Sequence, residues 1–275
     1  MLGLGGLTMR LGIMVRNMGP ASTPALIAAC ARYAEQAGLD DIWVCDHIAI
    51  PREESEGSGG RYLDPLATLA FLSGVTQRIG LGITVLILPY RPALPTAKWI
   101  ATTQELSGHR LRLGVGVGWM AAEFRALGIN RSNRGALTDQ TLDFFHRCFA
   151  EDEIESNGQR FLFNPRPPLP PILVGGSGSH CLARVVRFGD GWMPTSSEPD
   201  KLAGPIATLG AAMKAAGKTP PQVVPVASLP LNEYTASAAR LAALAAIGVT
   251  GFVQAGAYAT LDEFKANVDA LAALA

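Results

Sequence analysis

Short apolar runs alternate with amphipathic stretches along almost the whole chain. Most of the runs are continuous, as in GITVLIL, instead of switching between apolar and polar residues. Such runs are typical of parallel strands that are buried on both faces. We therefore predict strands at 10–15, 41–47, 79–88, 111–118, 171–176, 189–194, 223–231 and 248–256.

Each predicted strand is followed by a stretch with helix signals. Thr23-Pro24 places an N-cap side chain before a proline, and Thr260 with Glu263 forms a capping box. A polar break divides the fourth helix into two parts. The expected helices cover 23–37, 64–76, 95–106, 121–127 with 137–149, 179–188, 199–216, 235–246 and the segment that starts at 260.

These eight strand–helix units predict an α/β protein built as a closed (β/α)8 TIM barrel. The length of 275 residues suits one such barrel, which needs about 250. The segment 156–171 holds Asn157-Gly158 and several prolines, and we expect it to form a short insertion after the fourth helix. The other expectations are a single domain over 10–275, a disordered leader over 1–9 and a mobile loop over 51–61.

The charge balance and the cysteines narrow the classes of partner. Lys and Arg together number 23, as do Asp and Glu, so we expect neither nucleic acid nor a membrane as a partner. No apolar stretch approaches the ~18 residues of a membrane-spanning helix. The four cysteines form no CxxC pair and no cluster with metal-ligand spacing. We therefore expect no metal site and free thiols, which favour a cytoplasmic protein.

The reactive groups of such a barrel lie at the C-terminal ends of its strands. Asp46 and His47 end the second predicted strand, and a carboxylate beside an imidazole can bind a polar ring and exchange protons near neutral pH. The alternative is structural: Asp46 would tie down the following loop, and His47 would pack on Trp43.

Glycines end two further strands. In the fourth, Gly116 and Gly118 would let a flat ligand approach the backbone. After the fifth, backbone N–H groups and serine hydroxyls at the start of the next helix would make an anion site, although a plain tight turn has the same composition. The residues of this turn are Gly175, Gly176, Ser177 and Gly178.

Large side chains recur near the predicted strand ends. They would wall a pocket for a planar cofactor and a small organic substrate, or else serve in ordinary packing. The candidates are Trp43, Tyr90, Trp119, Met120 and Trp192.

Several segments together resemble one family. The segment 64–129, from DPLATLAF to EFRALGI, is similar to the signature core of the luciferase-like monooxygenases, and more narrowly to a subgroup of F420-dependent oxidoreductases. PILVGGSGS at 171–179 and ARVVRFGDGWMP at 183–194 match the same family in order and spacing. The resemblance covers nearly the whole chain, but it discriminates poorly between FMN and the deazaflavin F420.

The resemblance implies roles for residues already singled out. A non-proline cis peptide is expected at Thr84-Val85, beneath the ring of the cofactor. Asp46 and His47 are expected to contact the cofactor and the reacting group, with His47 as the catalytic residue. The glycine turn after the fifth strand is expected to hold the cofactor phosphate, and the chain is expected to form a homodimer.

One position departs from the pattern of the subgroup. Many members read GWN after the glycines of the fourth strand, whereas this chain reads GWM and carries Met120 in the last place. A polar contact near the cofactor or substrate is therefore expected to be missing, and the pocket is expected to be more apolar.

The expected function is that of an oxidoreductase that transfers a hydride between coenzyme F420 and a small organic substrate, with His47 exchanging the proton. Two alternatives share the fold: an FMN-dependent monooxygenase, because the cofactor decides the chemistry, and a non-catalytic flavin-binding barrel. An unrelated barrel lyase or aldolase would need a lysine at a strand end, and Lys98 falls in a predicted helix.

Overall fold

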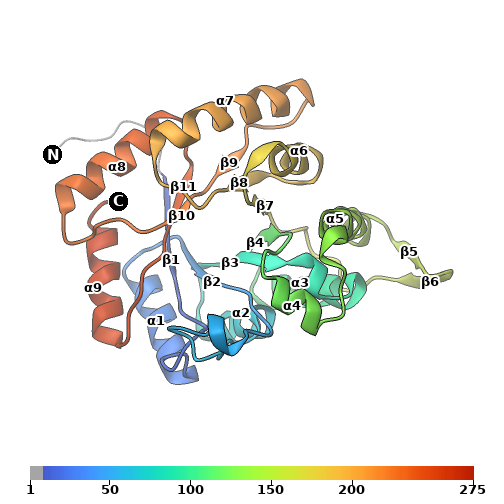
Figure 1. The fold of residues 1–275 in the computed structure, drawn as a ribbon, viewed down its shortest axis with the longest axis horizontal. Helices are drawn as coiled ribbons and strands as arrows, with labels where there is room; N and C mark the ends of the chain where they lie inside the picture. Colours follow the sequence, from blue (N-terminus) through green and yellow to red (C-terminus); the bar gives the residue numbers. More distant parts are fainter. Residues whose placement is uncertain (1–8) are drawn as a thin grey trace.

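The computed structural model describes residues 9–275, so the leader predicted over 1–9 falls almost wholly outside the described residues. These residues form an α/β fold in which a parallel sheet of nine strands curls and helices cover its outside (Figure 1). The order in the sheet is β10-β11-β1-β2-β3-β4-β7-β8-β9. The strands are β1 (Arg10–Met14), β2 (Asp41–Val44), β3 (Gly80–Ile87), β4 (Leu111–Gly116), β7 (Ile172–Gly175), β8 (Gly191–Met193), β9 (Gln222–Val223), β10 (Val226–Ala227) and β11 (Gly251–Gln254).

Two helices, α1 and α9, begin directly after the capping side chains predicted for them. Thr23 accepts a hydrogen bond from the backbone of Leu26, and Thr260 accepts one from Glu263. The helices are α1 (Pro24–Gln36), α2 (Pro65–Val75), α3 (Ala93–Leu106), α4 (Ala121–Ala126), α5 (Arg134–Ala150), α6 (Gly178–Phe188), α7 (Pro199–Ala215), α8 (Tyr234–Ala246) and α9 (Leu261–Ala272). Short 3-10 turns are η1 (Arg52–Glu54), η2 (Leu88–Tyr90) and η3 (Arg131–Asn133).

Strand β2 ends at Val44, three residues before the predicted end. The cause is Asn17, whose side-chain oxygen accepts the backbone N–H of Cys45 and whose amide donates to the carbonyl of Cys45. Because these groups bond a side chain and not a neighbouring strand, the ladder stops. Asp46 and His47 therefore stand in the loop that leaves the C-terminal edge of the sheet.

The strand predicted over 223–231 is two short pieces, β9 and β10, with Pro225 between them. Proline has no backbone N–H to donate to a ladder. The segment still bonds both neighbours: Val224 donates to Trp192 of β8, and Val253 of β11 donates to the carbonyl of Pro225.

The insertion after α5 is a two-stranded hairpin, β5 (Glu153–Ser156) with β6 (Gln159–Leu162), that projects from the body of the fold (Figure 1). It begins three residues before the expected segment, because the turn at Asn157-Gly158 lies at its tip and not at its start. Both turn residues have positive φ, 52° and 75°, as in the type I′ turns that Asn-Gly favours.

The loop predicted to be mobile over 51–61 packs against the segment that follows β1. Ser58 is buried, and Arg61 donates through Nε to the hydroxyl of Ser22 at 2.9 Å. The backbone of Gly19 also donates to the carbonyl of Arg61. These contacts explain how a polar, glycine-rich stretch is held beside the sheet.

Replacing Gly82 with alanine is expected to lower the free energy of unfolding by about 1–3 kcal/mol, because overpacking displaces neighbours. A Cβ at this position of β3 would stand 2.1 Å from the ring of Trp43, which is fully buried inside the curled sheet. The matched control is Gly74→Ala in α2, where no atom lies within 4 Å and alanine favours the helix. Denaturant unfolding compares the two variants, and equal stabilities would contradict this account.

Candidate functional site

His47 stands at the C-terminal edge of the sheet with one ring nitrogen held. Its Nδ1 lies 2.9 Å from Oε2 of Glu123, and its side chain is 17% exposed. The ring meets Tyr62 and Trp119 edge-on, with centroids 5.0 and 6.3 Å away. Because Nδ1 is engaged by a carboxylate, Nε2 is the nitrogen left to act on a ligand.

Glu123, in the first turn of α4, is a fully buried carboxylate. Its Oε1 accepts the backbone N–H groups of Ile48 and Ala49 at 2.5 and 3.0 Å, and its Oε2 accepts the hydroxyl of Tyr90 at 2.9 Å. Burial acts to raise the pKa of Glu123, but the hydrogen bonds from His47 and the two backbone groups outweigh it and lower the pKa to about 2. The carboxylate is therefore ionised at neutral pH.

Sequence reasoning missed Glu123, although a signal for it exists. It is the one acidic residue in the apolar stretch GWMAAEF that follows the glycines of β4. An acid in the first turn of a helix is ordinarily a favourable surface charge. Only its burial at the C-terminal edge of the sheet marks it as part of the site.

Asp46 is buried, and both oxygens of its carboxylate are engaged by other residues of the protein. Its carboxylate forms a two-pronged pair with Arg91, at 2.6 and 2.8 Å, and accepts the backbone N–H of Ile87 at 2.9 Å. Arg91 also pairs with Asp64, the N-cap of α2. These contacts are structural, but the backbone group that Asp46 holds belongs to β3, whereas the structural alternative expected the loop after His47. A direct cofactor contact by Asp46 remains a prediction and would have to come from its backbone.

The cis peptide predicted at Thr84-Val85 is present in β3. The register against β4 shifts between Ile83 and Leu86, so Val85 lies at an irregularity of the strand. Cβ atoms at Gly116 and Gly175 would stand 2.5 and 2.7 Å from the side chain of Val85. These glycines therefore make room for Val85, which is partly buried and packs against the core cluster around Trp43.

The glycine turn between β7 and α6 faces open space. Gly178 has a φ of +80°, and no atom lies within 4 Å of where its Cβ would be. Ser177 is the N-cap of α6, but its side chain caps no backbone group. The carbonyl of Gly176 accepts Nε1 of Trp192 at 2.8 Å, which fixes the turn. Gly175, Gly176 and Ser177 line a cavity of about 660 Å³ between α5 and α6.

The aromatic candidates divide into exposed and buried groups. Trp119 is 61% exposed beside His47 and is therefore free to meet a substrate. Trp43 is a fully buried core residue inside the sheet, and a place for it in a substrate pocket stays a prediction. Tyr90 is buried, and its hydroxyl donates a hydrogen bond to Glu123. Met120 is buried directly before α4.

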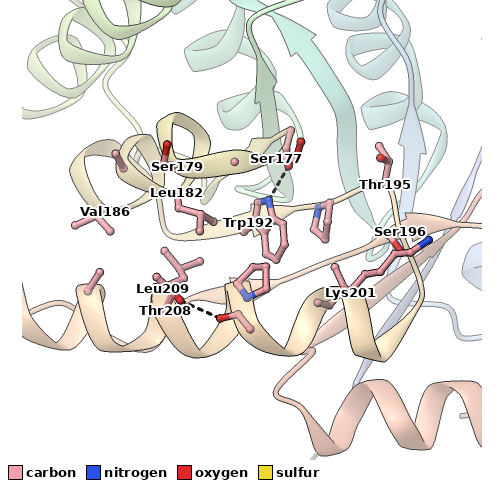
Figure 2. A pocket seen from close by; sticks show the side chains of 18 residues that line it. Ser177, Ser179, Leu182, Val186, Trp192, Thr195, Ser196, Lys201, Thr208 and Leu209 are labelled. Atoms are coloured by element: carbon pink, nitrogen blue, oxygen red, sulfur yellow. Dashed lines mark hydrogen bonds between the residues drawn. The ribbon is translucent and has the colours of Figure 1, made fainter.

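Gly118 and Trp192 both have close neighbours within the fold. Gly118 has positive φ, and a Cβ there would meet Ile87 at 2.7 Å. Trp192 is buried between α6 and α7 and lines a second cavity of about 720 Å³ (Figure 2). Apolar side chains of both helices, among them Leu182, Val186 and Leu209, point into that cavity (Figure 2). His47 lines neither cavity.

Within residues 9–275, no helix has the length and apolar character needed to cross a membrane. In the same part of the chain, His, Cys, Asp and Glu side chains form no group of three or more that is arranged to hold a metal ion.

A curled parallel sheet with polar side chains at its C-terminal edge is typical of α/β proteins that place their site there. The chain belongs to the luciferase-like monooxygenase family, whose model matches residues 9–273. This match confirms the family resemblance inferred from the sequence.

The relatives include two proteins with named activities. The 5,10-methylenetetrahydromethanopterin reductase of Methanolobus tindarius is 30% identical over 242 residues, which cover 86% of this chain and 69% of the relative. The F420-dependent hydroxymycolic acid dehydrogenase of Mycobacterium tuberculosis is 29% identical over 204 residues, which cover 70% of this chain and 55% of the relative.

Solved structures share the fold at low identity. The F420-dependent tetrahydromethanopterin reductase from Methanopyrus kandleri matches with a TM-score of 0.71 at 16% identity, covering 96% of this chain and 97% of its own. A type II Baeyer-Villiger monooxygenase from Pseudomonas putida, in complex with FMN, matches with a TM-score of 0.76 at 14% identity, covering 97% and 96%. The fold therefore occurs in an F420-dependent enzyme and in an FMN complex.

Proposed function

We propose that this chain is an oxidoreductase that transfers a hydride between coenzyme F420 and a small organic substrate. The observation that carries the proposal is the pair of His47 with the ionised Glu123 at the edge of the sheet. The pair stands on the same edge of the sheet as Val85 and the glycine turn before α6. The name of the F420-dependent relative supports the choice of cofactor.

The residues present fit a ligand with a flat ring and an anionic end. Val85 would lie beneath the ring, and the turn from Gly175 to Gly178 would take the phosphate at the start of α6. Arginines of α5 and α6 line the adjoining cavity, and their guanidinium groups can pair with anionic groups. When bound, the deazaflavin supplies a position that accepts or donates a hydride.

The protein's own residues exchange the proton and orient the group that carries it. Glu123 accepts from Nδ1 of His47 and so orients the imidazole, and this leaves Nε2 to take a proton from a substrate hydroxyl or return one to a carbonyl. Trp119 and Tyr62 flank the ring and provide apolar surface for the rest of the substrate.

Fluorescence titration of the purified protein with F420 and with FMN tests the choice of cofactor. We expect saturable binding of F420 and none of FMN at the same concentrations. Tight binding of FMN alone would instead favour the monooxygenase alternative, which the FMN complex among the structures keeps open. Binding of F420 without turnover on any alcohol or carbonyl compound would favour the non-catalytic alternative.

We further propose that the curled sheet is the closed (β/α)8 barrel expected from the sequence, with β9 and β10 acting as one strand. Supporting this, the segment around Pro225 bonds β8 on one side and β11 on the other. The hairpin β5–β6 is then the insertion into this barrel.

A cytoplasmic location is in keeping with the cysteines, all four of which are free. Burial raises the pKa of Cys30, Cys148 and Cys181 to about 11, so these thiols are unreactive at neutral pH.

We further propose a homodimer that buries the outer face of α2 and α3. Helix α2 carries no charged residue. The neighbouring exposed side chains are large and apolar: Phe71 is 43%, Trp99 is 51% and Leu106 is 66% exposed. An apolar face of this kind on two packed helices is typical of a surface that a second copy covers.

Replacing Trp99 with glutamate is expected to convert the dimer to a monomer. Size-exclusion chromatography with light scattering gives the mass of each form. Tyr234→Glu on α8 is the matched control, because this aromatic side chain is 59% exposed but lies away from α2 and α3. A monomeric native protein would contradict the proposed dimer.

A further inference from the structure

Helix α6 separates two cavities of opposite character. His180, Arg184 and Arg187 follow one another at helical spacing and line the cavity on the α5 side. On its other side, Leu182 and Val186 point toward α7 (Figure 2). Gly176 and Ser177 line both cavities, and they belong to the turn to which the proposed function assigns the cofactor phosphate.

The α5–α6 cavity carries an excess of positive charge. Arg134, Arg184 and Arg187 line it, against the single carboxylate of Asp139. Asp139 is engaged by Arg184, whose Nε lies 2.6 Å from it. Within residues 9–275, Arg134 and Arg187 pair with no carboxylate. The cavity therefore has cationic groups to offer to an incoming anion.

The cationic side chains extend well beyond the turn. From Gly178 to Arg187, α6 advances nine residues, which is about 13 Å at 1.5 Å per residue. A phosphate held at Ser177 would leave the outer arginines free. FMN ends at its phosphate, whereas F420 continues past it into a chain of glutamates, each of which carries a carboxylate.

We propose that the outer part of the α5–α6 cavity binds the glutamate tail of F420, with Arg134 and Arg187 paired to its carboxylates. The inference rests on the proposed function and adds the feature by which this chain distinguishes F420 from FMN. The α6–α7 cavity is unsuited to the tail, because apolar side chains such as Leu209 would leave the carboxylates unpaired.

The test compares two forms of the cofactor on two forms of the protein. Deazaflavin fluorescence measures the affinity of wild type and of an Arg134→Gln/Arg187→Gln variant for F420 with its glutamates and for F420 that lacks them. Wild type is expected to bind the glutamate-bearing form about tenfold tighter, which corresponds to 1.4 kcal/mol. The variant is expected to bind both forms alike, with unchanged affinity for the tail-less form.

Two controls separate the tail from general effects. Lys201→Gln, at the α6–α7 cavity, removes a positive charge near the same turn and is expected to keep the tenfold preference. Raising the salt concentration is expected to weaken binding of the glutamate-bearing form more than binding of the tail-less form, because the first has more charges to screen. Circular dichroism melting of the variant checks that it is folded.

Each result bears on one claim. Equal affinity of wild type for the two forms, or a preference that survives in the double variant, would overturn the tail site and leave the proposed function standing. Failure of wild type to bind either form would overturn the proposed function, and this inference with it.

Discussion

Replacing His47 with alanine is expected to lower kcat by about 100- to 10,000-fold, the usual contribution of a general acid or base. The imidazole of His47 stands at the edge of the sheet with Nδ1 held by Glu123, so Nε2 can exchange a proton with the substrate. The affinity for F420 is expected to persist, since His47 lines neither of the two cavities that adjoin the glycine turn. The absorbance change of the deazaflavin gives the rate, with the best substrate from a panel of alcohols and carbonyl compounds.

His146→Ala is the matched control for this experiment. His146 lies in α5, and its Nε2 contacts the carbonyl of Phe188 at 2.9 Å, away from Glu123. Its loss is expected to leave kcat unchanged. Turnover by the His47 variant at the wild-type rate would remove His47 from the chemistry and would favour its structural alternative.

Replacing Glu123 with alanine is expected to lower the free energy of unfolding by about 3–5 kcal/mol, the cost of breaking a buried pair. The carboxylate is fully buried and accepts four hydrogen bonds, from Ile48, Ala49, His47 and Tyr90. Alanine would leave these donors without an acceptor. Denaturant unfolding measures the loss. Glu105→Ala on the exposed face of α3 is the control, expected to change stability by less than about 0.5 kcal/mol.

The same residue predicts how stability depends on pH. The folded pKa of Glu123, about 2, lies below the unfolded value of about 4.3. A depressed pKa contributes stability that is present above the unfolded value and is lost as pH falls toward the folded one. Wild type should therefore lose more stability than Glu123→Gln between about pH 5 and pH 2. Parallel losses in the two proteins would contradict the assignment.

Local signals in the sequence were enough to predict the strand–helix alternation. Continuous apolar runs mark strands buried on both faces, and capping residues such as Thr23 and Thr260 act within a few positions of themselves. The Asn157-Gly158 turn is local in the same sense. One error arose from a distant group, because Asn17 ends β2 early. The other was local, because Pro225 lies inside the predicted seventh strand and divides it.

The sequence by itself determined that His47 leaves the C-terminal edge of the sheet and that a glycine turn precedes α6, since both follow from where strands end. Only the tertiary structure decided the partners of these groups. Glu123 reaches His47 across 76 residues, and Val85 fills the space beside Gly116 and Gly175. Trp43 likewise lies in the core because the curled sheet encloses it. Curling the sheet brings distant strands to one edge, and the pattern of a single segment does not encode which side chains meet there.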